Sequence, residues 1–286
     1  MRLMVIALAV LVSQGALAAS PVGSVSQQRV VSADGAITET IFALGGGASV
    51  VGVDTTSTYP AAVQALPKVG YLRALPFEGV LSLQPDRLIT TEDAAPEQAL
   101  GRLERAGVRV ERLPIPRTPE QSLARIEQVG ALIGRDAAAA ELITRLDHEL
   151  DAVTAQAEAR GWRPRVLFIL SAGNHGVVFG GAETGADALL QSLNADNAMA
   201  AVSGYKPASR EAVIASTPDA IVIAEAWPGQ FQIDDWPELA RLPAWQAGHR
   251  YVGDSMFLLG FGPRLPEAMA AVNGVLPSRA VPLDGH

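Results

Sequence analysis

Two residues in the first quarter of the chain could bind a metal together. Tyr71 and Arg73 lie two residues apart in the segment VGYLR, which spans residues 69–73. A phenol ionises at a pKa of about 10, and a neighbouring cation such as Arg73 favours the ionised form. The phenolate oxygen is a hard anionic ligand that suits ferric iron, and tyrosine also serves as an axial haem ligand. The spacing leaves a second interpretation open, a packed loop tyrosine whose hydroxyl makes one hydrogen bond.

The composition restricts the other kinds of site that the chain could form. It contains no cysteine, which excludes thiolate zinc sites, iron–sulfur clusters and disulfides and leaves nitrogen or oxygen ligands for any metal. Its net charge of −8 argues against a nucleic-acid partner, because phosphate neutralisation needs a basic surface. The only two lysines are Lys68, three residues before Tyr71, and Lys206, beside Tyr205. A length of 286 residues predicts two domains.

The first eighteen residues have the pattern of a cleaved export signal. Met1-Arg2 precedes an apolar run from Leu3 to Val12, and Ala16-Leu17-Ala18 matches a signal-peptidase site. An apolar run of about ten residues is too short to span a bilayer. We therefore expect residues 1–18 to be removed, giving a soluble periplasmic protein with a net charge of −9, since one arginine is lost. Without a cysteine, we expect no lipid anchor.

Apolar runs alternate with helical patterns from residue 29 onward. Strands are predicted at 29–33, 49–53, 88–90 and 108–113, and helices at 37–44 and 96–106. This alternation predicts an α/β lobe built on a parallel sheet. The triplet Gly45-Gly46-Gly47 follows a helix, so it indicates a helix end rather than a dinucleotide-binding loop.

A long helix is predicted in the middle of the chain. Thr118 and Pro119 start one helix, which we expect Gly130 and Gly134 to interrupt. The next runs from 136 to 159, and its 24 residues would span roughly 36 Å. A strand at 165–170 then restarts the alternation. The fold prediction is therefore α/β, with two Rossmann-like lobes and parallel sheets, 19–134 and 161–286, joined by a rigid linking helix at 135–160.

An internal repeat supports two similar lobes. A glutamate, a Pro-Asp pair and an apolar run occur twice in the same order, with corresponding residues 133 positions apart. The first copy has Glu78 and Pro85-Asp86, and the second has Glu211 and Pro218-Asp219. Each copy reads as a short helix, a turn and a strand. Two such lobes would enclose a cleft, and ligands bind beyond the carboxyl ends of strands in open α/β sheets.

Several segments together resemble the haem-binding periplasmic proteins of bacterial haemin ABC importers. The resemblance covers nearly the whole mature chain. It is specific in VGYLRAL and elsewhere is shared with the wider class III of iron-complex and cobalamin binding proteins, which have two α/β lobes joined by a long rigid helix. The segments that carry it are RVVSADGAITETIFALGGGASVVGVDTTSTYP, LPKVGYLRAL, EGVLSLQPDRLI, GYKP at 204–207, EAVIASTPDAIVI at 211–223 and LLGFGPR at 258–264.

The resemblance implies a role for particular residues. Tyr71 corresponds to the ligand of the haem iron, Arg73 to the residue that hydrogen-bonds its phenolate, and His175 to the second iron ligand of some members. Glu78 and Glu211 correspond to carboxylates that dock on arginines of the permease; they could equally be acids that complement a helix dipole. Further candidates for contact with the ligand are Tyr205, Lys206, Arg264 and Lys68.

The implied function is the capture of ferric haem in the cleft and its delivery to an inner-membrane ABC permease dimer with its ATPase, downstream of an outer-membrane haem receptor. No enzymatic activity is expected. A siderophore or cobalamin binder of the same class is the first alternative. An exported hydrolase is a remote one, suggested by Gly253-Asp254-Ser255, which resembles the start of a GDS-type esterase motif but lies late in the chain without a partnering Asp-x-x-His.

Overall fold

The N-terminal lobe is built on a four-stranded parallel sheet. The computed structural model describes residues 28–171 and 177–279. The strand order is β2-β1-β3-β4, and every pairing is parallel, as the alternation predicts. The elements of this lobe are β1 (Val30–Ala33), α1 (Gly35–Ala43), β2 (Val50–Val53), α2 (Phe77–Leu81), β3 (Arg87–Thr91), α3 (Glu97–Arg105) and β4 (Arg109–Leu113).

The C-terminal lobe has a mixed sheet, so the prediction of a parallel sheet is wrong for part of it. β9 pairs in parallel with β5 and β10, whereas β6 is antiparallel to β5 and β8. Only five residues connect β5 to β6, and a parallel crossover needs a dozen or more.

The strands of this lobe are β5 (Arg165–Ser171), β6 (Val177–Gly180), β7 (Asp196–Asn197), β8 (Tyr205–Pro207), β9 (Ala220–Glu225) and β10 (Arg250–Asp254). The helices are α6 (Gly185–Ser192), α7 (Arg210–Ser216), α8 (Pro237–Arg241), α9 (Pro243–Gln246), α10 (Ser255–Leu259) and α11 (Leu265–Asn273).

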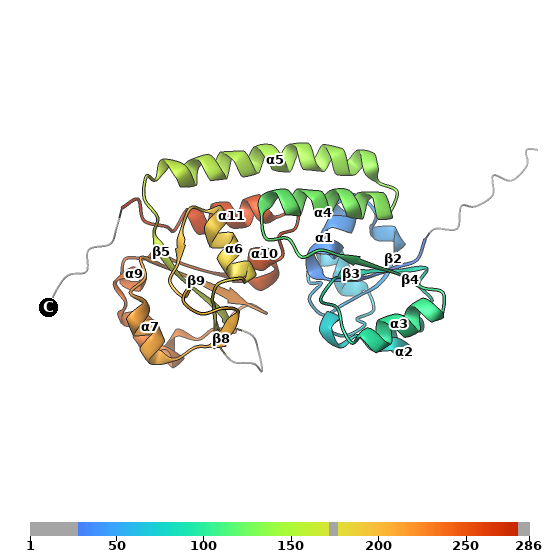
Figure 1. Ribbon diagram of the computed structural model, residues 1–286, viewed down its shortest axis with the longest axis horizontal. Coiled ribbons are helices and arrows are strands. Elements are labelled where there is room, and N and C mark those ends of the chain that lie inside the picture. Colours follow the sequence, from blue (N-terminus) through green and yellow to red (C-terminus); the bar gives the residue numbers. More distant parts are fainter. Residues whose placement is uncertain (1–27, 172–176, 280–286) are drawn as a thin grey trace, which may run out of the picture.

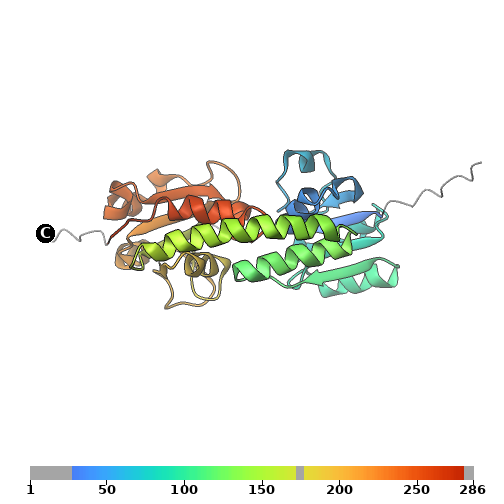
Figure 2. The ribbon, with the colours of Figure 1, turned by 90° about the horizontal axis from the view of Figure 1, so that it is seen from above.

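The long helix α5 (Asp136–Ala159) lies across both lobes (Figures 1 and 2). Its buried stripe is divided between two hydrophobic cores. Leu142 and Leu146 pack in the core of the N-terminal lobe, and Leu150 and Val153 in that of the C-terminal lobe. Because one rigid helix contributes to both cores, it restrains the relative movement of the lobes. No helix in the described part of the chain combines the length and hydropathy of a membrane span.

The helix before α5 continues through a glycine that was expected to interrupt it. α4 runs from Pro119 to Leu132, and Thr118 caps its start by accepting from the amide of Gln121. A Cβ on Gly130 would stand 2.5 Å from the Cβ of Ala139 in α5. The glycine therefore allows α4 and α5 to approach closely, and the break comes at Gly134, which has a positive φ of 65°.

The repeat corresponds to equivalent elements in the two lobes. α2 precedes β3 and α7 precedes β9, and both helices lie on the side of the molecule away from α5 (Figure 1). In each copy the aspartate of the Pro-Asp turn accepts a hydrogen bond from a backbone amide at the start of the first strand of its lobe. Asp86 accepts from the amide of Arg29 at 2.8 Å, and Asp219 accepts from the amide of Arg165 at 2.8 Å.

Candidate functional site

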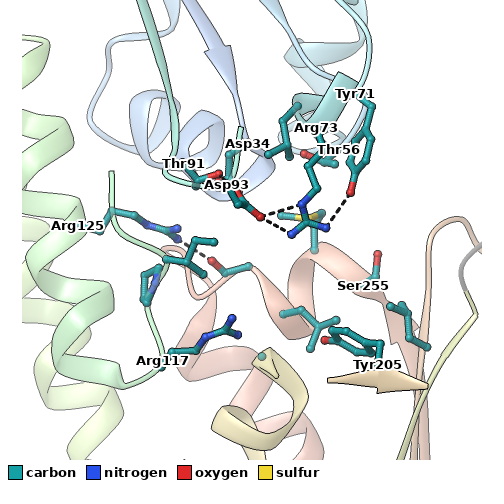
Figure 3. A pocket seen from close by; sticks show the side chains of 18 residues that line it. Asp34, Thr56, Tyr71, Arg73, Thr91, Asp93, Arg117, Arg125, Tyr205 and Ser255 are labelled. Carbon is teal, nitrogen blue, oxygen red and sulfur yellow. Dashed lines mark hydrogen bonds and ion pairs between the residues drawn. The ribbon is translucent and has the colours of Figure 1, made fainter. Parts of the chain in front are cut away.

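A cleft between the lobes contains the predicted tyrosine–arginine pair (Figure 3). Its volume is about 280 Å³. This size is at the lower end of the usual range for small-molecule pockets, about 300–1,000 Å³, and the cleft is open to solvent. The lining comes from both lobes and consists of Asp34, Thr56, Tyr71, Leu72, Arg73, Thr91, Asp93, Ile115, Pro116, Arg117, Arg125, Leu170, Gly185, Tyr205, Ser255, Met256, Leu259 and Gly260.

Tyr71 and Arg73 contact each other directly in this cleft. Arg73 Nη1 donates to Tyr71 Oη at 3.1 Å, and Arg73 Nε donates to Asp93 Oδ2 at 2.8 Å. Burial alone would lower the pKa of Arg73, but Asp93 and Tyr71 raise it overall. The guanidinium therefore stays charged and holds its donor on the phenol oxygen. Tyr71 is 41% exposed and lines the cleft, so a ligand there can reach it.

Asp93 keeps Arg73 in place. Burial would raise the pKa of Asp93, but hydrogen bonds from Thr91 and Arg73 hold it below its usual value. The backbone joins the two segments as well, because the Ala95 amide donates to the Leu72 carbonyl at 3.0 Å. Asp93 therefore sets the orientation of Arg73, and sequence reasoning missed it. The available signal was its position three residues after the predicted strand at 88–90.

Tyr205 faces Tyr71 from the opposite lobe (Figure 3). Its side chain is 39% exposed, and burial raises its pKa, which favours the neutral phenol. Lys206, the next residue along β8, does not line the cleft, because successive side chains of a strand point to opposite faces. Tyr205 and Lys206 were both predicted to contact the ligand, but they lie on opposite faces of β8.

The other predicted contacts lie elsewhere in the fold. Lys68 Nζ donates to the Ser57 carbonyl at 2.7 Å, and loss of water around it lowers its pKa. Arg264 Nε donates to Glu39 Oε2 at 2.8 Å, so this arginine joins the C-terminal lobe to the N-terminal one. Neither Lys68 nor Arg264 lines the cleft. His175 lies outside the described residues.

Glu78 and Glu211 occupy equivalent positions at the two ends of the molecule. Each is in the first turn of its helix, α2 or α7, and each is exposed. A backbone hydrogen bond at the helix start lowers the pKa of Glu78, and Arg102, whose Nη2 donates to Glu78 Oε1 at 3.1 Å, lowers it further. The pair therefore presents two carboxylates on the side of the molecule away from α5.

Ser255 also lines the cleft, but the described residues do not complete a hydrolytic site around it. No histidine is among the described lining residues. Asp254 Oδ1 accepts from the amide of Phe257 at 2.7 Å, which is a helix cap rather than a contact with a catalytic base. The Gly253-Asp254-Ser255 sequence is therefore explained by the start of α10.

Three comparisons agree with this architecture. The crystal structure of a periplasmic haem-binding protein from Pseudomonas aeruginosa is 36% identical, with 90% of this chain and 95% of that one covered and a TM-score of 0.78. The periplasmic haem-binding protein RhuT from Roseiflexus sp. RS-1, in its apo form, is 32% identical over 87% of this chain and 97% of that one, with a TM-score of 0.80. An uncharacterised ABC transporter substrate-binding lipoprotein of Bacillus subtilis strain 168, YvrC, is 28% identical over 85% of this chain and 77% of its own length.

The family assignment follows from a match to most of the chain. The family model described as "Periplasmic binding protein" matches residues 30–256, from β1 of the N-terminal lobe to the start of α10. This range includes both sheets and the long helix between them. It supports the prediction of a binding protein rather than an enzyme. The chain belongs to the periplasmic binding protein family.

Proposed function

We propose that this protein captures ferric haem in its interlobe cleft and delivers it to an inner-membrane ABC permease. The observation that carries the proposal is the contact between Tyr71 Oη and Arg73 Nη1 inside the cleft. It combines an oxygen that suits ferric iron with a cation that donates a hydrogen bond to that oxygen. The haem-binding descriptions of two similar structures support the same ligand.

Each residue of the pair has a distinct role in this proposal. Tyr71 supplies the phenolate that coordinates the iron, and Arg73 hydrogen-bonds that oxygen. Asp93 fixes the guanidinium from the other side. Apolar walls suit the porphyrin ring, and the lining includes Leu72, Ile115, Leu170, Met256 and Leu259. A siderophore would bring its own iron ligands and would not need the phenolate.

The test is a titration of the purified apoprotein with haemin, followed by absorbance spectroscopy. We expect a shifted Soret band and a phenolate-to-iron charge-transfer band at a stoichiometric end point. A parallel titration with cyanocobalamin should show no saturable binding. Absence of a haemin-induced spectral change, or preferential binding of cyanocobalamin, would contradict the proposal.

Arg73→Met should weaken haemin binding by about ten- to a hundredfold, the usual effect of removing a group that orients a metal ligand. Methionine retains much of the apolar stem but donates no hydrogen bond to Tyr71. The measurement is the haemin dissociation constant with the spectrum of the complex. Arg105→Met, at an exposed position of α3, is the matched control and should bind as the wild type does. Equal losses in both variants would contradict a specific role for Arg73.

We further propose that Glu78 and Glu211 dock the two lobes on matching basic patches of a permease dimer. Glu78→Arg with Glu211→Arg should slow haem uptake by a permease–ATPase complex in proteoliposomes at least about tenfold, because each substitution replaces an attraction with a repulsion. Haemin affinity should not change, since neither residue lines the cleft. Glu127→Arg on α4, an exposed acid outside this surface, is the control. Unchanged uptake by the double variant would exclude the docking role.

The same proposal places the mature protein in the periplasm, after cleavage of residues 1–18 and without a lipid anchor, with an outer-membrane haem receptor upstream. The mass of the protein released by osmotic shock tests the cleavage site directly. A mass that includes residues 1–18, or retention in the membrane fraction, would contradict this part of the proposal.

A further inference from the structure

Within residues 28–171 and 177–279, one of the three arginines that line the cleft has neither a carboxylate partner nor a side-chain hydrogen bond. Arg73 is bound to Asp93 and Tyr71. Arg125 is buried and donates to the carbonyls of Gly260 and Phe261 at 2.6 and 3.0 Å. Arg117 forms no ion pair within residues 28–171 and 177–279. In the same part of the chain it donates a hydrogen bond through its backbone amide and none through its side chain. The guanidinium of Arg117 is therefore available to a ligand.

The lining of the cleft carries more positive than negative charge. Its two carboxylates, Asp34 and Asp93, face three guanidinium groups. Asp93 is bound by Arg73, and Asp34 Oδ1 accepts from the amide of Ile37 at the start of α1. Asp34 also interacts electrostatically with Arg125. Three guanidinium groups against two carboxylates therefore leave one excess positive charge, on Arg117. In a chain of net charge −8, a local positive excess inside a cleft attracts an anionic ligand selectively.

Arg117 is placed at the boundary between the lobes. It belongs to the segment that connects β4 to α4, and it extends into the cleft on the side of Tyr205 (Figure 3). An ideal Cβ on Gly185 would stand 3.5 Å from Arg117 Nη1, so the guanidinium lies against the beginning of α6 in the opposite lobe. A ligand that occupies the cleft beside Tyr71 therefore has a free guanidinium on its far side.

We infer that Arg117 binds a carboxylate of the ligand. The cleft would then select a porphyrin with two carboxylates over a macrocycle that has none. This inference rests on the proposed function and refines it. The planar guanidinium can donate two parallel hydrogen bonds to a carboxylate. Haem carries two propionates, whereas the corresponding side chains of cobalamin are amides. Lys68, Lys206 and Arg264 were the basic residues predicted to contact the ligand, and the inference assigns the carboxylate contact to Arg117 instead.

The experiment compares haemin with haemin dimethyl ester, in which both propionates are blocked and the iron is unchanged. The wild-type protein should bind haemin roughly ten- to a hundredfold more tightly than the ester, the range expected for hydrogen bonds to a charged group. Arg117→Gln should lose most of this preference through weaker haemin binding, while its affinity for the ester stays the same. The phenolate charge-transfer band should persist, and Arg105→Gln should behave as the wild type.

The outcomes separate this inference from the proposed function. If the wild type binds haemin and its ester equally, the carboxylate contact is wrong while haem binding stands. If Arg117→Gln weakens both ligands to the same extent, with an unchanged circular dichroism spectrum, Arg117 supports the cleft without recognising a carboxylate and the inference is also wrong. If the wild type binds neither ligand, the proposed function and the inference both fail.

Discussion

Replacing Tyr71 with phenylalanine should abolish the phenolate-to-iron charge-transfer band and weaken haemin binding by at least about a hundredfold. Loss of an orienting group alone costs about ten- to a hundredfold in metal affinity, and loss of the ligating atom should cost at least the upper end of that range. Phenylalanine keeps the ring and removes only the oxygen. Because Tyr71 is 41% exposed, the variant should fold normally, with stability within about 0.5 kcal/mol of the wild type.

Tyr205→Phe is the matched control for this prediction. It makes the same chemical change on the other wall of the same cleft. Burial raises the pKa of Tyr205, so its phenol is poorly suited to act as an anionic ligand. Its variant should keep the charge-transfer band. Loss of the band in Tyr205→Phe together with its retention in Tyr71→Phe would reverse the assignment of the iron ligand.

Local patterns in the sequence predicted the elements that depend on local interactions. The contact between Tyr71 and Arg73 spans two residues, so their spacing alone brought them within reach of each other. The helix at 136–159 was predicted with the bounds that α5 has, because its apolar stripe recurs at helical spacing over many turns. The four strands of the N-terminal sheet were also predicted from the local sequence, each within one residue of its bounds.

The missed features depend on contacts between distant parts of the chain. Asp93 acts through Arg73, twenty residues away, and Arg125 reaches carbonyls 135 and 136 residues later. Arg264 was assigned to the ligand, yet it pairs with Glu39, 225 residues earlier. A single sequence does not show which of several arginines meets a given carboxylate, because that choice depends on how the two lobes pack. The antiparallel strand β6 was missed for a different reason, because its pairing with β5 is local but no strand was predicted at Val177–Gly180.

Two sets of contacts join the lobes beside the helix α5. In the first, Ser122 and Arg125 of α4 donate to the carbonyls of residues 260 and 261 in the C-terminal lobe. In the second, Arg264 binds the carboxylate of Glu39 and stacks 4.1 Å from the ring centre of Tyr59. Together with the divided stripe of α5, these contacts favour small hinge motions over a large closure. Release of the ligand would then require the permease to strain these contacts.

Arg264→Leu should lower the free energy of unfolding by about 3–5 kcal/mol, because it leaves Glu39 as a buried carboxylate without its partner. The side chain of Glu39 is 5% exposed and that of Arg264 is 19% exposed, so water compensates little for the loss. For a protein of this size, the melting temperature should fall by roughly 10 °C. Thermal unfolding followed by circular dichroism measures this shift. Arg145→Leu, which removes the exposed pair with Glu149 on α5, should cost less than about 0.5 kcal/mol and is the control.

The pH dependence of the Arg264→Leu variant tests the cause of its instability. Burial already raises the pKa of Glu39 above its usual value, even though Arg264 lowers it. A carboxyl whose pKa is raised in the folded state stabilises that state below its unfolded pKa and loses this contribution as the pH rises through the folded pKa. The variant should therefore differ less from the wild type at pH 4 than at pH 7, and Glu39→Gln should restore part of its stability at pH 7. Either of two results would show that lost packing rather than the unpaired carboxylate destabilises the protein. One is a loss of stability that is independent of pH, and the other is an Arg264→Leu/Glu39→Gln double variant that is no more stable than Arg264→Leu.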